Sequence, residues 1–445
     1  MTPRHPSEYG LSEELSADIE ILDRLLSEVL ADQEGDQLLS AIRSLYGPDG
    51  DHVEMHDPRL VERALKACTV LFQLINTAEQ TEIIRVNRRR RALHAETPRP
   101  ESVGEAVVRL KRLGMTAAQM QALISRLEVC PTLTAHPTEA RRRVVVEKHQ
   151  EIARLLTERS MPTDAARVDV PLDAGGVPEH ELYRALTALW QTDELRAAPM
   201  GVADEVRNVA HYIEHTVFDV VTWLHADLRR ALAQAYPGHT FDIPPFLLFR
   251  SWVGGDRDGN PNVTPEVTWE TLVYNKRCAL ECYRQRVWDL HRQFTVSARL
   301  VEPSAALLAS IEQDRALVGL PREQVEQHAR EPYALKLLCI HERLSATLRH
   351  LDELSDLHAE GPSFVAQPPA YRRSTELLED IGLIQDSLRA GKAAVLADDG
   401  PLADLVVQIR AFGFHLFSLD MRQHSAEHEK VVSEMLEEAH MLPPD

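Results

Sequence analysis

One histidine in this chain stands at a junction where proteins commonly bind ligands. His136 lies within the stretch Thr132-Leu133-Thr134-Ala135-His136-Pro137-Thr138-Glu139-Ala140-Arg141-Arg142-Arg143. The apolar and β-branched residues 127–135 predict a short strand, and Pro137 has a backbone φ that suits the first turn of a helix. At such a strand-to-helix junction the helix N-terminus directs unpaired N–H groups toward a ligand.

The three arginines at the end of this stretch call for a negative partner. They stand in the first turns of a helix predicted over residues 139–159, where the helix dipole favours acidic side chains instead. An anion bound beside His136 would balance their charge. A histidine before a proline is also a common residue at a helix start, and the stretch alone leaves both interpretations open.

Two further predicted strands also end in polar clusters. Residues 246–253 form an apolar run, followed at once by the glycine-rich segment 254–262. Residues 414–424 form a third strand, whose end carries Asp420 and Arg422. Because the carboxyl ends of parallel strands share one face, we expect the three clusters to converge. Their imidazole and guanidinium groups would suit a phosphate or a carboxylate.

The glycine-rich segment has two simpler interpretations. One is a tight surface turn held by Asp and Asn hydrogen bonds to the backbone, which stays open. The other is a calcium loop, since Asp256, Asp258 and Asn260 fall at its first, third and fifth positions. Pro261 stands where that loop needs glycine, and Val267 where it needs a bidentate glutamate. We therefore reject the calcium loop.

Composition limits the class of protein. The 445 residues are 44% hydrophobic and carry a formal net charge of −20, which argues against a general nucleic-acid surface. Five scattered cysteines indicate reduced thiols and a cytoplasmic protein. No run approaches the roughly 18 apolar residues that a membrane helix needs, so we expect no membrane insertion.

Helical periodicity dominates the rest of the chain, with a polar loop expected at residues 161–178. The first predicted helix carries an apolar stripe formed by Ile19, Leu22, Leu25, Leu26, Val29 and Leu30. The helices predicted after it are 58–91, 103–113, 116–127, 139–159, 179–196, 204–235, 264–299, 304–319, one starting at 332, 375–390, 401–412 and 426–440.

These residues closely resemble the phosphoenolpyruvate carboxylase family. The stretch around His136 matches the family's first signature in full. Four other blocks also resemble sequences of this family: Asn76-Thr77-Ala78-Glu79-Gln80, Gln191-Thr192-Asp193-Glu194, Arg250-Ser251-Trp252-Val253-Gly254-Gly255-Asp256-Arg257-Asp258-Gly259-Asn260-Pro261 and Leu419-Asp420-Met421-Arg422-Gln423. The resemblance extends over residues 10–440 but covers only the first half of the family's length.

The resemblance implies a mostly α-helical α/β fold. Residues 1–126 would form an N-terminal helical region. Residues 127–445 would form the first part of an incomplete TIM-type (β/α)8 barrel, with three parallel strands embedded in many helices. The family's second signature, with its active-site lysine, has no counterpart here. We therefore expect a fragment, or one half of a split enzyme, that is inactive without the complementary half.

In the family, bicarbonate attacks the phosphorus of phosphoenolpyruvate to give carboxyphosphate and the enolate of pyruvate. Carboxyphosphate then releases phosphate and carbon dioxide, and the carbon dioxide adds to the enolate to form oxaloacetate, which feeds the tricarboxylic acid cycle. By resemblance, His136 takes the proton of carboxyphosphate, a task that suits an imidazole.

The resemblance also implies roles for other side chains. Arg422 would bind phosphoenolpyruvate, and Trp252, Arg257 and Asp258 would line the pocket near bicarbonate. Supporting residues would be Arg142, Arg143, Asp256 and Asp420. We expect magnesium as the cofactor, with its ligands beyond residue 445, together with allosteric control and a homo-oligomer, a tetramer in the family.

Two alternatives remain open. The chain could be a non-catalytic scaffold or regulatory subunit of the same fold. It could also be a phosphotransferase in which His136 itself accepts a phosphoryl group.

Overall fold

The computed structural model describes residues 10–45, 57–93, 98–134, 142–159, 179–194, 200–258, 260–356 and 366–441. The chain divides into two compact units, which we describe separately. Unit 1 takes in residues 1–100 and 137–199, and unit 2 takes in residues 101–136 and 200–445. The domain boundary expected after residue 126 stays a prediction. The two compact units are divided differently, because each unit takes in two separate stretches of the chain.

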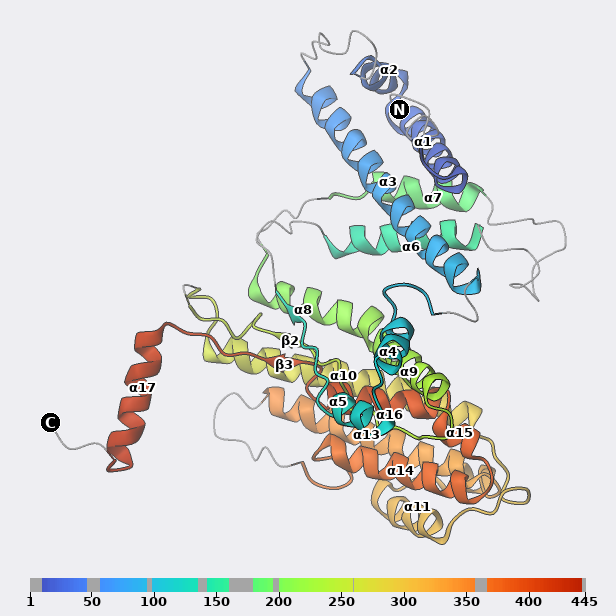
Figure 1. Cartoon of the computed structure of the whole chain (residues 1–445). Helices are drawn as coiled ribbons and strands as arrows, with labels where there is room; N and C mark the ends of the chain where they lie inside the picture. Colours follow the sequence, from blue (N-terminus) through green and yellow to red (C-terminus); the bar gives the residue numbers. More distant parts are fainter. Residues whose placement is uncertain are drawn as a thin grey trace. The chain divides into compact units, whose positions relative to one another are not determined.

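Unit 1 is a helical bundle around a leucine-rich core (Figure 1). Its helices are α1 (Glu13–Glu34), α2 (Asp36–Leu45), α3 (Pro58–Leu93), α6 (Arg143–Arg159) and α7 (Glu179–Trp190). The apolar stripe of α1, which includes the fully buried Leu26 and Leu30, packs against α3 and α7. Helical spacing of these apolar residues explains why the sequence folds into helices here.

Unit 2 contains the sheet and the larger core. Its helices are α4 (Val103–Arg112), α5 (Ala117–Ile124), α8 (Val202–Tyr212), the π-helix Ile213–Val217, α9 (Phe218–Ala235), α10 (Pro265–Gln293), α11 (Ala305–Val318), α12 (Arg322–Gln327), α13 (Pro332–Asp356), α14 (Ser374–Ala390), α15 (Ala394–Asp398), α16 (Pro401–Phe412) and α17 (Ser425–Glu438). Helices α10 and α13 pack along each other (Figure 1). Helix α17 has no buried residue.

In the described part of the chain, the sheet consists of three short parallel strands in the order β1-β2-β3. These are β1 (Thr132–Leu133), β2 (Arg250–Ser251) and β3 (Ser418–Leu419). In register, Thr132 pairs with Arg250, which also pairs with Ser418. The predictions of three parallel strands and of a mostly helical α/β chain are confirmed, whereas the barrel stays a prediction.

Each strand is much shorter than the run that predicted it. Pro131 has no N–H to extend the ladder before β1. Strand β2 ends because the carbonyl of Trp252 accepts the N–H groups of Gly255 and Asp256, which closes a turn. Strand β3 begins late because Leu416 has a positive φ of 62°, which interrupts extended backbone just before it.

Most predicted helices are present with shifted ends. The helix predicted over 401–412 coincides with α16, and the one from 332 with α13. The helix predicted over 179–196 ends instead at Trp190, where Gln191 and Thr192 continue only as a turn. The π-helix divides the one predicted over 204–235. The predicted loop 161–178 lies outside the described residues.

A buried ion cluster joins three helices of unit 2. The ammonium of Lys336, whose exposed fraction is 0%, donates to Asp314 at 2.6 Å and to Asp380 at 2.5 Å. Arg343 and the hydroxyl of Tyr371 each donate to the other oxygen of Asp380 at 2.6 Å. Two cations thus balance two buried carboxylates, which links α13 to α11 and α14.

Replacing this lysine should destabilise unit 2. In Lys336→Met both carboxylates lose a buried counter-charge, so we expect a loss of about 3–5 kcal/mol in the free energy of unfolding. Burial already raises the pKa of Asp314, and the charge of Lys336 opposes that rise. A carboxyl whose pKa is raised in the folded state binds a proton more tightly there than in the unfolded chain, so protonation stabilises the fold. The loss of unfolding free energy in Lys336→Met should therefore shrink as pH falls from neutral into the acidic range.

Urea unfolding at several pH values would measure this deficit. Lys430→Met on the exposed face of α17 is the control and should change stability by less than about 0.5 kcal/mol. A deficit for Lys336→Met no larger than that of the control would contradict the account of this cluster.

Candidate functional site

The polar clusters that follow β2 and β3 lie side by side. The backbone N–H of Arg257 donates to the carbonyl of Arg422 at 2.8 Å, and the N–H of Arg422 donates to the carbonyl of Gly255 at 3.0 Å. Asp256 and Arg422 thereby form one further parallel bridge beyond the strands. The structure thus brings together two of the three clusters that the sequence predicted to converge. His136, in the third, lies outside the described residues.

Arg422 is oriented by two neighbours from the other cluster. Its Nη1 lies 3.2 Å from Oδ2 of Asp256, and its guanidinium carbon lies 4.7 Å from the ring centre of Trp252. The side chain is still 50% exposed. A cation stacked on an aromatic face, with one N–H directed at a carboxylate, has its other N–H groups available to an anion.

Arg257 has a different environment. Its Nη2 donates to the hydroxyl of Thr268 at 3.0 Å, and its Nε is buried without a hydrogen-bond partner among the described residues. Nearby, Oδ1 of Asp256 accepts the N–H of Asp258 at 3.2 Å, while Asp258 itself is exposed. The Asp-stabilised turn that the sequence left open is therefore present, and it carries the arginine.

Glycines allow the two clusters to approach each other. Gly254 has a φ of +85°, and a Cβ there would collide with the side chain of Thr271 on α10. A Cβ on Gly255 would lie 2.5 Å from the backbone carbonyl oxygen of Asp420. Asp420 contributes to the arrangement through its backbone, since its N–H also donates to the carbonyl of Ser251 at 2.8 Å.

Arg142 and Arg143 belong to unit 1. Arg142 donates through its backbone N–H to the carbonyl of Glu194 and through Nη1 to that of Asp193, both at 3.3 Å. Nε of Arg143 pairs with Glu147 at 2.8 Å, one turn along α6. Among the described residues, backbone carbonyls are therefore the partners of Arg142, and a glutamate at i, i+4 is the partner of Arg143.

Thr268 is the residue that sequence analysis missed. It lies in the first turns of α10, where a threonine ordinarily indicates only a helix start. No local pattern connects it with Arg257, eleven residues earlier. Its contact becomes visible only once the loop folds back on the helix.

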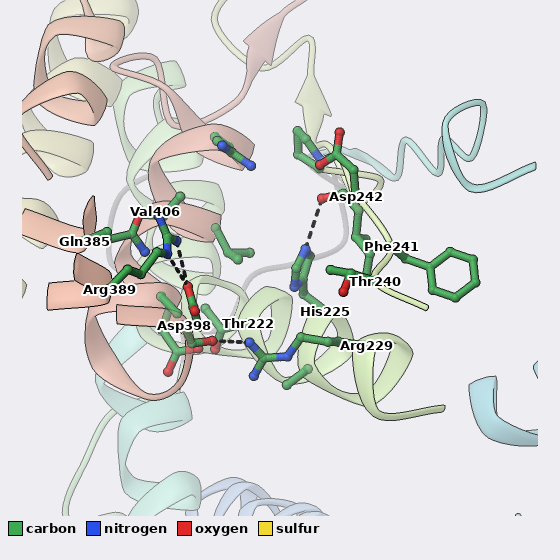
Figure 2. A pocket seen from close by; sticks show the side chains of 17 residues that line it. Thr222, His225, Arg229, Thr240, Phe241, Asp242, Gln385, Arg389, Asp398 and Val406 are labelled. Atoms are coloured by element: carbon green, nitrogen blue, oxygen red, sulfur yellow. Dashed lines mark hydrogen bonds and ion pairs between the residues drawn. The ribbon is translucent and has the colours of Figure 1, made fainter. Parts of the chain in front are cut away.

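A cavity of about 520 Å³ lies elsewhere in unit 2, among α9, α14, α16 and residues 240–245 (Figure 2). Its charges largely satisfy one another, because Arg389 binds Asp398 through Nε at 2.9 Å and Nη2 at 2.7 Å. His225 contacts the carbonyl of Ile243 at 3.2 Å. In the sequence, α9 and residues 240–245 precede β2, and α14 and α16 precede β3, whereas each polar cluster directly follows its strand. We therefore place the candidate site at the clusters.

Among the described residues, no group of three or more His, Cys, Asp or Glu side chains is arranged to hold a metal ion. No helix in the same part of the chain has the length and apolar character needed to cross a membrane.

The fold and the clusters define an α/β protein that presents arginines at the carboxyl ends of parallel strands, suited to an anionic ligand. Comparison with known proteins specifies the family. The profile of the phosphoenolpyruvate carboxylase family matches residues 15–444, and the chain belongs to that family.

Curated relatives support the same assignment. The chain is similar to the phosphoenolpyruvate carboxylase of Rhodothermus marinus, with 36% identity over 96% of this chain and 45% of the relative. The enzyme of Roseiflexus castenholzii is 35% identical over 96% of this chain and 46% of the relative. That of Chromobacterium violaceum is also 35% identical, over 97% and 46%. The chain spans about half the length of the curated relatives it matches.

Replacing Gly255 should separate the two clusters. In Gly255→Ala the added methyl group must displace the backbone of Asp420, at a cost of about 1–3 kcal/mol in unfolding free energy. Gly382→Ala is the matched control, because a Cβ there meets nothing within 4 Å in the middle of α14. The control should be neutral or stabilising by up to about 1 kcal/mol. Equal stability of the two variants in urea unfolding would contradict the close approach.

Proposed function

We propose that this chain supplies the N-terminal part of a phosphoenolpyruvate carboxylase active site. The reaction would convert phosphoenolpyruvate and bicarbonate into oxaloacetate and phosphate. The observation that carries the proposal is the half-exposed guanidinium of Arg422, held by Trp252 and Asp256 at the carboxyl end of β3. Family membership supports the choice of phosphoenolpyruvate as the anion.

The proposed chemistry has three steps. A bicarbonate oxygen attacks phosphorus, and the bond between phosphorus and the enol oxygen breaks, which leaves carboxyphosphate and the pyruvate enolate. Carboxyphosphate then gives its proton to His136 and separates into phosphate and carbon dioxide. The enolate carbon attacks that carbon dioxide to form oxaloacetate. The role of His136 rests on the signature motif and on the suitability of imidazole as a base near neutral pH.

The surrounding residues would hold the anions during these steps. Arg422 would bind phosphoenolpyruvate by charge-assisted hydrogen bonds. Trp252, Arg257 and Asp258 would form the wall beside bicarbonate. Asp256 and Asp420 would support that wall, Asp256 through its pairing with Arg422 and Asp420 through its backbone. Arg142 and Arg143 would supply positive charge near His136 in the sequence.

Other properties follow from the family. Magnesium is the expected cofactor, but the described side chains of this chain do not form a site for it, and we assign it no step here. The three strands would belong to a (β/α)8 barrel. We also propose that the protein is a cytoplasmic homo-oligomer under allosteric control. For activity this chain would need the complementary C-terminal half that other members of the family have.

Oxaloacetate formation, followed with coupled malate dehydrogenase, tests this dependence. The chain should be inactive alone and active when the remainder of a family member is supplied. Activity of the chain alone would contradict the need for a complement. No activity in either case would favour the non-catalytic scaffold.

The phosphotransferase alternative makes a different prediction. Labelled phosphoenolpyruvate would then phosphorylate His136 without bicarbonate. The carboxylase proposal requires that no such protein label appears and that phosphate release depends on bicarbonate.

The proposed base, His136, can be tested in the completed enzyme, which is this chain together with the remainder of a family member. His136→Asn should abolish oxaloacetate formation, because carboxyphosphate loses the group that accepts its proton. Bicarbonate-dependent phosphate release should persist. Both products can be measured in one assay series, and full carboxylation by this variant would remove His136 from the mechanism.

The substrate contact can be tested in the same enzyme. Arg422→Ala should raise the KM for phosphoenolpyruvate by about 10- to 100-fold, the equivalent of a lost charge-assisted contact of roughly 1.5–3 kcal/mol. Arg322→Ala is the control, since the side chain of Arg322 on α12 is 91% exposed and should leave KM unchanged. Equal KM values for the two variants would exclude Arg422 from the site.

A further inference from the structure

The first turns of α10 lie directly behind the loop that follows β2. Thr268 and Thr271 are only 5% and 3% exposed, and both face this loop. Thr271 occupies the space that a side chain on Gly254 would need. The backbone of the loop therefore rests on two buried threonines.

The hydroxyl of Thr268 connects two parts of the loop. It donates to the carbonyl of Gly254 at 2.8 Å and accepts the Nη2–H of Arg257 at 3.0 Å. The carbonyl of Thr264, at 3.2 Å, is a more distant acceptor for the same proton. A hydroxyl that donates and accepts in this way fixes the direction of both bonds.

Arg257 depends on this hydroxyl for its orientation. Among the described residues, Thr268 is its one side-chain hydrogen-bond partner, no ion pair compensates its charge, and its Nε is buried without a partner. Arg422 differs, since a carboxylate and an indole hold it. A neutral hydroxyl orients the Arg257 guanidinium without cancelling its charge, which leaves that charge for an anion.

We propose that Thr268 is a positioning residue, which holds Arg257 and the carbonyl of Gly254 so that the guanidinium stays directed at an anionic group of the substrate. Its part in the reaction rests on the proposed function. Its structural part, ordering the loop, does not.

The structural part is tested by hydrogen–deuterium exchange of the peptide covering residues 252–258. Thr268→Val keeps the shape of threonine but removes the hydroxyl, and it should raise the exchange rate of this peptide about tenfold. Thr268→Ser keeps the hydroxyl and should exchange as the parent does. Thr222→Val is the matched control, because Thr222 is also buried and also donates to a backbone carbonyl, that of Asp219. Parental exchange of the loop in Thr268→Val would overturn the proposal.

The part in the reaction is tested by a double-mutant cycle in the completed enzyme. Thr268→Val should lower kcat/KM about tenfold, and Thr268→Ser should restore most of it. Because Thr268 acts through Arg257, adding Thr268→Val to Arg257→Gln should cause little further loss. A full tenfold further loss in that background would overturn the role, as would parental kcat/KM in Thr268→Val.

Thr268→Ala, in the same two assays, keeps the test decisive if the valine variant does not fold. It should match the expectation for valine in loop exchange and in kcat/KM. A parental enzyme that forms no oxaloacetate would refute the proposed function, while loop exchange would still decide whether Thr268 orders the loop.

Discussion

The candidate site depends on one stretch of backbone pairing. Here residues 255–257 pair with Arg422 and continue the parallel sheet beyond the ends of β2 and β3. Two hydrogen bonds, of 2.8 and 3.0 Å, join these segments. They bring side chains that are more than 160 residues apart in sequence into contact, with Arg422 over Trp252 and beside Asp256. Only a residue without a side chain fits at position 255, because the carbonyl of Asp420 occupies the space. Without this pairing, nothing would hold the segments of Arg257 and Arg422 next to each other.

The pairing leaves the two arginines in electrostatically different positions. A carboxylate pairs with Arg422 and an aromatic ring supports it, yet half of its side chain is exposed. A threonine hydroxyl holds Arg257, without a carboxylate partner among the described residues. Partial compensation of one cation and weak compensation of the other suit the anion site that we propose here. The buried cluster around Lys336 shows the opposite arrangement, in which each cation is paired with carboxylates and no charge among its described residues is left for a ligand.

Long, regular features could be predicted from the sequence. The helix over 401–412 was predicted to the residue because Pro401 and Gly413 mark its two ends. The parallel strands and the neighbouring positions of Asp256 and Arg422 followed from apolar runs that end in polar clusters. The helices α12 and α15 were missed, since 6 and 5 residues are too few to show a helical period. Strand lengths were overestimated because turns at Trp252 and Leu416 depend on backbone conformation. The contact between Arg257 and Thr268 depends on tertiary folding, which no local pattern encodes.

The central claim is that this site takes part in carboxylation through carboxyphosphate. The most direct measurement is the fate of oxygen-18 from labelled bicarbonate in the completed enzyme. If a bicarbonate oxygen attacks phosphorus, each phosphate released with oxaloacetate must carry one labelled oxygen, which mass spectrometry of the phosphate would detect. Unlabelled phosphate formed together with oxaloacetate would show that bicarbonate never attacked phosphorus, and it would contradict the account.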